Sequence, residues 1–326
     1  MKLPHRRQFL HLAAGAAALP ALPRIARAQA YPTRPVRIIV GFAAGGTADV
    51  TSRLIAQWLS ARLGQQFVVE NRTGAGGNLA AEAVVRSPAD GYTLLYFSSS
   101  HAFSATLYEK LNYNLIRDIA AVASVTLVPS VMEVNPLIAP KTIPEFIAYA
   151  KANPGMINMA AAGAGSATHI YGELFKMMAG VDLVPVQYRG SGPALTDLIS
   201  GQVQVMFDQL PGSIEHIRAR KLRPLGVTTT TRLESLPNVP TIGEFVPGYE
   251  ALLWQGIGAP KNTPTPIVDK LNREINAALI DPKFMTRLAD LGAAAFPGSS
   301  ADFSKLVAEE IEKWGRVIRA ANIKAE

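Results

Sequence analysis

The stretch Val36-Arg-Ile-Ile-Val-Gly-Phe-Ala-Ala-Gly-Gly-Thr-Ala-Asp49 decides the fold. Its first five residues are mostly β-branched and apolar, which is typical of a buried strand. After the glycine- and alanine-rich part, apolar side chains recur at helical spacing over 50–63, and the pattern ends at Gly64. Thr47 is a good N-cap, and Asp49 in the first turn suits the helix dipole. The stretch therefore predicts a strand, a glycine-rich turn and a helix.

The alternation of strand and helix continues through the first hundred residues. The run 67–70 predicts a second strand, and the glycine-rich segment 74–77 opens a helix that runs to about Arg86. Turn residues at 88–91 precede a third strand at 92–97. Strands that alternate with helices predict a parallel sheet covered by helices.

A similar pattern follows and indicates a second lobe. The apolar run 119–134 is broken only by Pro129, and we expect it to cross between two lobes, with 252–259 as the second crossing strand. We therefore predict an α/β fold with two lobes, parallel-rich sheets and two crossing strands. Lobe 1 takes residues 31–125 and 254–326, and lobe 2 takes 126–253. The other expected elements are strands at 157–162, 183–188, 203–207 and 222–228, and helices at 143–152, 170–179, 194–200, 213–220, 267–280, 282–291 and 301–321.

The first 30 residues have the layout of an export signal. A basic start is followed by an uncharged stretch over 8–23 that is rich in Ala and Leu, and then by small-residue cleavage sites. We expect the signal to be cleaved near Ala28 or Ala30 and the product to be periplasmic. The string Arg6-Arg7-Gln8-Phe9-Leu10 resembles a twin-arginine signal. An ordinary Sec signal or a lipid-free N-terminal anchor stays open as the alternative.

Charge and cysteine content exclude several classes of function. The chain has 32 basic and 25 acidic residues, a net charge of +7, but five of the basic residues lie in the first 30 and no acidic residue does. The remainder therefore carries 27 basic and 25 acidic residues, so a basic stripe for nucleic acid is not expected. The chain contains no cysteine, which excludes thiol catalysis, iron–sulfur clusters and cysteine-based zinc sites.

Motifs of common enzyme classes are missing. The sequence has no phosphate-binding P-loop, no nucleophile elbow and no H-E-x-x-H motif. A dinucleotide fingerprint fails because Thr168 stands where the third glycine would follow Gly163 and Gly165. Beyond the first 30 residues the histidines are His101, His169 and His216, and none has a second ligand at metal spacing. We expect no catalytic residue, no metal and no cofactor, and hence not an enzyme.

Two glycine-rich loops remain as the candidate chemistry: the first loop (residues 41–49) and the second loop (residues 163–169), in which Ser166 is the expected cap. A glycine-rich loop at a helix N-terminus presents backbone N–H groups and partial positive charge, so it holds an anion without Lys or Arg. Ligands of open α/β sheets lie beyond the carboxyl ends of the strands. One loop on each lobe would then face a shared cleft that suits a ligand with one or two carboxylates. Simple turn chemistry is the alternative.

Several polar side chains near these loops have two interpretations each. Asp49 is a capping acid or a ligand contact, and His169 is a packed side chain or a binder. The serines before His101 supply hydroxyl donors or form a turn, and Asp208 contacts the ligand or hinge, or caps the turn at 211–212. The candidate ligand-binding residues are Phe42, Ala43, Ala44, Gly45, Gly46, Thr47, Asp49, Ser99, Ser100, Ala162, Gly163, Gly165, Ser166, Thr168, His169 and Asp208.

The chain resembles the Bug family, the substrate-binding proteins of tripartite tricarboxylate transporters. The resemblance is carried by motifs that run nearly from end to end, including Val69-Glu-Asn-Arg-Thr-Gly-Ala-Gly-Gly-Asn78 and Trp254-Gln-Gly-Ile-Gly-Ala-Pro260. Two departures are Gly41, where the family usually has proline and which should loosen the start of the first loop, and the less polar segment 161–165. The other matching motifs are 39–49, 90–95, 149–155, 190–197, 207–211 and 236–241.

This resemblance implies a type II-like Venus-flytrap fold, the two-lobed architecture of periplasmic binding proteins. Family members bind small carboxylates, often dicarboxylates, amino-acid-type acids or aromatic acids. The two loops clamp the ligand largely through backbone amides and ordered water. The closed protein would deliver the carboxylate to the membrane permease subunits of the transporter. Alternatives are a ligand sensor that presents the solute to a receptor kinase, or a periplasmic enzyme that uses His169 or Asp208. We expect a monomer that does not bind nucleic acid.

Overall fold

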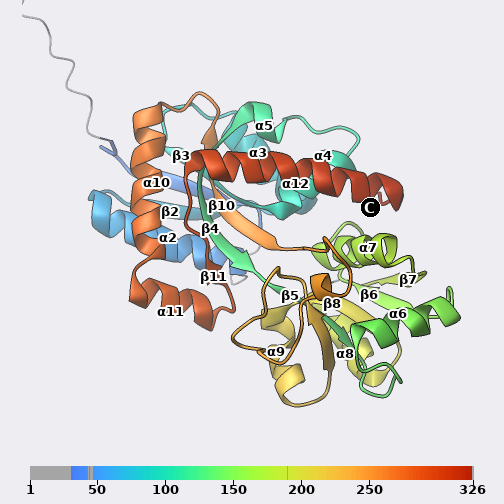
Figure 1. The fold of residues 1–326 in the computed structure, drawn as a ribbon. Coiled ribbons are helices and arrows are strands. Elements are labelled where there is room, and N and C mark those ends of the chain that lie inside the picture. Colours follow the sequence, from blue (N-terminus) through green and yellow to red (C-terminus); the bar gives the residue numbers. More distant parts are fainter. Residues whose placement is uncertain (1–30, 43, 45–46, 189, 325–326) are drawn as a thin grey trace, which may run out of the picture.

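The computed structural model describes residues 31–42, 44, 47–188 and 190–324, which form two α/β lobes with one sheet each (Figure 1). The prediction of a two-lobed α/β fold is confirmed. The first sheet has six strands in the order β11 (Ala294–Ala295), β4 (Ile119–Val128), β10 (Leu253–Pro260), β3 (Thr93–Ser98), β1 (Val36–Val40) and β2 (Phe67–Asn71). The second has five, in the order β7 (Val184–Gln187), β6 (Asn158–Ala161), β8 (Val205–Gln209), β5 (Ser130–Val134) and β9 (Arg223–Val227).

Helices cover both sheets. In the first lobe they include two short elements, η1 (Ala75–Gly77) and α5 (Leu115–Asp118), and the longer helices α2 (Thr47–Leu63), α3 (Asn78–Val85), α4 (Ser99–Leu107), α10 (Thr265–Leu279), α11 (Pro282–Asp290) and α12 (Ser300–Ala320). In the second lobe they are α6 (Ile143–Ala152), α7 (Ala167–Ala179), α8 (Ser191–Ser200), α9 (Leu210–Arg218) and the short η2 (Ile242–Glu244). No helix in the described part of the chain is both long and apolar enough to cross a membrane.

The sheets are mixed, and each has a parallel part as predicted. Each contains three parallel strands, β2–β1–β3 in the first lobe and β7–β6–β8 in the second. The remaining pairs are antiparallel, because β10 and β11 run opposite to the other strands of the first sheet and β5 runs opposite to the other strands of the second. The carboxyl ends of the three parallel strands in each lobe still lie together, and these ends carry the glycine-rich loops.

Pro129 separates the two strands of the first crossing. β4 belongs to the six-stranded sheet and ends at Val128, and β5 joins the five-stranded sheet at Ser130. Proline lacks an N–H group and so interrupts a ladder of hydrogen bonds at the point where the chain passes between sheets. The chain returns between β9 and β10, which starts in the first sheet at Leu253 opposite Val128.

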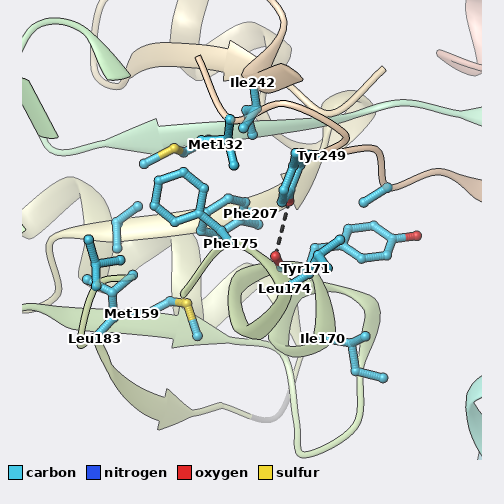
Figure 2. Close-up of a cluster of buried hydrophobic side chains, with 14 of the residues drawn as sticks. Met132, Met159, Ile170, Tyr171, Leu174, Phe175, Leu183, Phe207, Ile242 and Tyr249 are labelled. Carbon is cyan, nitrogen blue, oxygen red and sulfur yellow. Dashed lines mark hydrogen bonds between the residues drawn. The ribbon is translucent and has the colours of Figure 1, made fainter. Parts of the chain in front are cut away.

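The core follows the two-residue period of the strands. In β1, Ile38 and Val40 pack into the cluster beneath α2 and α10, while Ile39 packs into the opposite cluster beneath α3. In the second lobe, Met132 and Phe207 belong to the cluster beneath α7. Figure 2 shows part of that cluster, including the hydrogen bond from Tyr249 Oη to the carbonyl oxygen of Tyr171. Both sheets are therefore buried on two faces.

The C-terminal helix α12 packs on both lobes. Phe303 and Val307 belong to a first-lobe cluster with Phe97, whereas Trp314 and Val317 belong to the second-lobe cluster. Figure 1 shows α12 running over the first lobe, with its C-terminal end close to α7. We propose that the chain passes between the lobes at Pro129 and just before Leu253, within a few residues of the boundaries predicted at 125/126 and 253/254, and that α12 is shared by both lobes.

Candidate ligand-binding cleft

A cavity of about 280 Å³ lies between the lobes. Its first-lobe wall comes from the first loop, from η1 and from α4, and its second-lobe wall comes from the residues that follow β6. Small-molecule sites are commonly about 300–1,000 Å³ in volume, so this cavity suits a small ligand. The lining residues are Phe42, Gly76, Ser100, Ser104, Leu107, Tyr108, Ala162, Gly163, Ala164, Gly165 and Ser166.

The second-lobe wall is a helix N-terminus with unused backbone donors. Gly163 and Gly165 have positive φ angles of 119° and 72°, which favour glycine. Ser166 caps α7, because its Oγ accepts a hydrogen bond from the His169 N–H at 3.4 Å. Among the described groups, the N–H groups of Gly163 and Ala164 meet no acceptor. These donors and the positive end of the helix dipole make this wall favourable for an anion.

Thr168 and His169 hold the second loop from behind. Thr168 Oγ1 accepts the Ala162 N–H at 2.7 Å, and His169 Nδ1 accepts the Gly165 N–H at 3.2 Å. Burial lowers the pKa of His169, and the positive charge of Lys176 lowers it further, which keeps Nδ1 available as an acceptor. Both side chains are buried outside the cavity lining and give the loop its shape.

The first-lobe wall is built on α4. Ser100 and Ser104 are four residues apart and so lie on one face of the helix, toward the cavity. Leu107 and Tyr108 extend this wall at the end of the helix. The wall therefore offers hydroxyl donors beside an apolar surface. Gly76 completes it, and a Cβ at that position would lie 3.7 Å from both Ser104 Oγ and Tyr108 Oη.

The start of the first loop is closely packed. A Cβ atom on Gly41 would lie only 2.5 Å from the Gly77 Cα, and one on Gly77 would lie 2.9 Å from the His101 ring. This close contact is at odds with the expectation that Gly41 loosens the loop. His101 is fully buried, and burial lowers its pKa to about 4. Its Nδ1 accepts the Ser98 N–H at 3.3 Å, so the ring is neutral and carries its proton on Nε2.

Asp49 holds the first loop from outside the cavity lining. Its carboxylate accepts hydrogen bonds from Arg53 Nε at 3.0 Å and from Asn71 Nδ2 at 2.9 Å. The same Asn71 amide donates to the carbonyl oxygen of Phe42 at 3.0 Å. Asp49 thus links α2 and β2 to the backbone of the loop. Thr47, the expected cap, is the first residue of α2.

The candidates from the sequence fall into three groups. Phe42, Ser100, Ala162, Gly163, Gly165 and Ser166 line the cavity. Ala43, Gly45 and Gly46 lie outside the described residues. The remaining candidates lie outside the cavity lining: Ala44, which is exposed, and Thr47, Asp49, Ser99, Thr168, His169 and Asp208.

Five lining residues were missing from the sequence prediction: Gly76, Ser104, Leu107, Tyr108 and Ala164. Ala164 lies within the predicted second loop, and Gly76 lies in a turn that was predicted only as a helix start. Ser104 and Leu107 come from α4, which was not predicted as a helix, and Tyr108 follows directly after it. Once Ser100 opens a helix, helical spacing places Ser104 beside it.

A larger cavity, of about 610 Å³, is lined by α12, Trp254 and the segment near Glu250. Its wall holds four glutamates against one lysine and one arginine, which makes it unfavourable for an anion. Within the described ranges, no group of three or more His, Asp or Glu side chains could hold a metal ion.

Two α/β lobes with a cavity between a helix N-terminus and the facing lobe define a two-lobed solute-binding protein. The sequence matches the family described as "Tripartite tricarboxylate transporter family receptor" over residues 51–323, and the chain belongs to this family of periplasmic binding proteins. It is 37% identical over 300 residues to protein BugT of Bordetella pertussis, covering 91% of this chain and 92% of that one.

Solved structures agree with this assignment. An R. palustris protein with adipate is 38% identical, with a TM-score of 0.78 over 91% of this chain and 100% of that chain. MatC from Rhodopseudomonas palustris, with bound malate, is 35% identical, with a TM-score of 0.74 over 88% of this chain and 100% of that chain. Both were solved with a small dicarboxylic acid.

Proposed function

We propose that the protein captures a small carboxylate between its lobes and delivers it to the membrane permease subunits of a tripartite tricarboxylate transporter. The observation that carries the proposal is the cavity wall at the N-terminus of α7, where the N–H groups of Gly163 and Ala164 lack an acceptor in the described structure. A carboxylate accepts such donors, and the helix dipole stabilises its charge.

The ligand class follows from the size and polarity of the cavity. One carboxylate would bind at the second loop, and the apolar side chains of Phe42 and Leu107 would cover a short carbon chain. Ser100 and Ser104 would donate to a second polar group. We propose dicarboxylic acids of about four to six carbons, the size range of the malate and adipate found in the two relatives.

Binding would favour the closed arrangement of the lobes. A ligand that contacts both lobes shifts the equilibrium between open and closed forms by its differential affinity for the two. Gly165 of the second lobe and Leu107 of the first already meet at the cavity wall. The membrane partner would then recognise the closed, ligand-bound conformation.

The remaining features of the proposal rest on the sequence and the family. Residues 1–30 would be an export signal, cleaved near Ala28 or Ala30, that sends a monomer to the periplasm. The protein would act by binding and release, without catalysis, and nucleic acid would not be a partner.

The test is native mass spectrometry of residues 31–326, followed by thermal-shift measurements with acetate, succinate, malate, adipate, citrate and aspartate. We expect a co-purified acid, or a rise in melting temperature with one or more dicarboxylates, as one-site linkage requires. A flat panel with an empty mass would contradict the proposal. Pull-down of detergent-solubilised membranes with the loaded protein should recover permease subunits, and recovery of a receptor kinase instead would overturn delivery to a transporter.

A further inference from the structure

Glu133 is a buried carboxyl group in the core of the second lobe. It lies in β5, two residues after Val131, and so projects from the same face of the sheet. That face is packed with apolar side chains such as Met206 and Ile217. Glu133 is 0% exposed, and its Oε2 atom has no hydrogen-bond partner among the described residues.

One serine hydroxyl lies between Glu133 and a second buried acid, Asp208. Ser213 Oγ is 2.6 Å from Glu133 Oε1 and 3.2 Å from Asp208 Oδ2. A hydroxyl group has a single proton and can donate to only one of the two carboxyl groups. If both contacts are hydrogen bonds, one carboxyl group must itself carry a proton and donate it to Ser213. The proton lies on whichever of the two carboxyl groups has surroundings that favour its neutral form.

The surroundings favour the neutral form of Glu133. Burial raises its pKa to about 8, and the nearby charge of Asp208 contributes to this. Burial raises the pKa of Asp208 as well, but hydrogen bonds from Ser191, Gln209 and Ser213 oppose that effect. No basic side chain of the described residues forms an ion pair with either acid. The basic residue of the neighbouring strand β9, Arg223, lies opposite Val134 and donates to the carbonyl groups of Pro136, Ile138 and Pro140 instead.

The chain of hydrogen bonds leads from this core to the start of α8, which lies near the second loop. Asp208 Oδ1 accepts the hydroxyl of Ser191, the first residue of α8, at 2.7 Å. Ser191 follows β7 and Asp208 lies in β8, and these two strands flank β6. The hydrogen bond therefore connects the chain segments on the two sides of the end of β6. Tyr188 follows β7, three residues before Ser191, and its carbonyl oxygen would be 3.8 Å from a Cβ on Gly163, a cavity-lining residue that follows β6.

We propose that Glu133 carries a proton, and that the chain Glu133–Ser213–Asp208–Ser191 positions the second loop for its ligand. This inference rests on the proposed function, because it treats the second loop as a ligand-binding wall. Its consequence is that ionisation of Glu133 places two negative charges around Ser213 and weakens the hold on the loop. Ligand affinity should then fall at alkaline pH.

The first test is Glu133→Gln, because glutamine copies the shape and charge of the neutral acid and can donate to Ser213. The raised pKa means that the folded protein holds a proton that the unfolded chain releases above about pH 4.5, so stability should fall as pH rises from about 5 to 8. Without ligand, the melting temperature of the wild type should decrease over this range relative to Glu133→Gln. The control Glu312→Gln changes an exposed glutamate and should follow the wild type.

The second test is affinity for adipate and malate by calorimetry from pH 6 to 9. The wild type should weaken several-fold above pH 8, Glu133→Gln should stay constant, and Ser191→Ala should bind several-fold more weakly at every pH. Parallel melting profiles of wild type and Glu133→Gln would overturn the proton on Glu133. Unchanged affinity of Ser191→Ala would overturn the positioning role. If neither acid binds the wild type, the proposed ligand class and the positioning role both fail, while the melting profiles still decide the protonation.

Discussion

Gly165 of the second lobe packs directly against Leu107 of the first. A Cβ atom on Gly165 would lie 2.6 Å from Leu107 Cδ1, and both residues line the cavity between the lobes. Gly165 also has a φ of 72°, in the region that favours glycine. A glycine is therefore required here by the backbone conformation and by the fit of one lobe on the other.

We expect Gly165→Ala to weaken dicarboxylate binding by at least about tenfold, since a shift of the loop of an ångström is enough to misplace its N–H donors. Calorimetry with the acid found in the thermal-shift panel measures the effect. Gly180→Ala is the matched control: Gly180 has a φ of 63°, but a Cβ there would meet no atom within 4 Å. It should lose about 1 kcal/mol of stability and keep its affinity. Equal affinity losses in both variants would contradict the role of the Leu107 contact.

Asp49 should position the first loop without binding the ligand. Asp49→Asn keeps a carbonyl oxygen that can accept from Asn71, whereas Asp49→Ala removes the acceptor and releases the amide that holds the Phe42 carbonyl group. We expect Asp49→Ala to weaken binding by about tenfold and Asp49→Asn by less than about threefold. Glu309→Gln, in an exposed ion pair with Lys305, is the control that should change neither affinity nor stability measurably. A larger loss for Asp49→Asn than for Asp49→Ala would contradict this role.

Much of the fold could be predicted because the local signals agree with the tertiary structure. The run 36–40 becomes β1 and the run 143–152 becomes α6 with the predicted bounds, and Pro129 separates β4 from β5. β-branched runs, caps and glycine-rich turns act within a few residues, so one sequence is enough to find them. The sharing of α12 by both lobes could not be predicted, because helical periodicity shows that one face is buried but not what buries it.

The candidate site was predictable in its loops and not in α4. The second loop is a local structure, made of a strand end, positive-φ glycines and a serine cap, and its residues 163–166 line the cavity. In α4, apolar residues are sparse and serines interrupt them, so the segment 99–107 lacks a clear helical pattern. Its buried face is decided by contact with Tyr171 and Trp314, far away in the sequence.

The serines of α4 should contribute hydrogen bonds to the ligand. Removing one neutral hydrogen bond costs about 1 kcal/mol, or roughly a fivefold loss of affinity. We therefore expect Ser100→Ala and Ser104→Ala each to bind about three- to tenfold more weakly, with little change in melting temperature. Ser200→Ala, at the exposed end of α8, should bind like the wild type. Normal affinity in both α4 variants would remove this helix from the site.

His101 should make the protein sensitive to acid. Its pKa is about 4 in the folded protein, against 6.5 for the free side chain, because burial disfavours the charged ring. The unfolded chain therefore binds the proton first, and the stability from this residue is present above about pH 6.5 and is lost as pH falls toward 4.

The full loss corresponds to about 3 kcal/mol at 1.36 kcal/mol per pKa unit. Urea unfolding at pH 7 and pH 5 measures it: His101→Gln should be less stable than the wild type at pH 7 and lose less on acidification. His216 in α9 is less buried than His101, so His216→Gln should keep the wild-type dependence of stability on pH. The effect of Glu133 has the opposite sign, since it stabilises the fold toward low pH, so comparing Glu133→Gln with His101→Gln separates the two. If His101→Gln loses as much stability on acidification as the wild type, the acid sensitivity does not come from this ring.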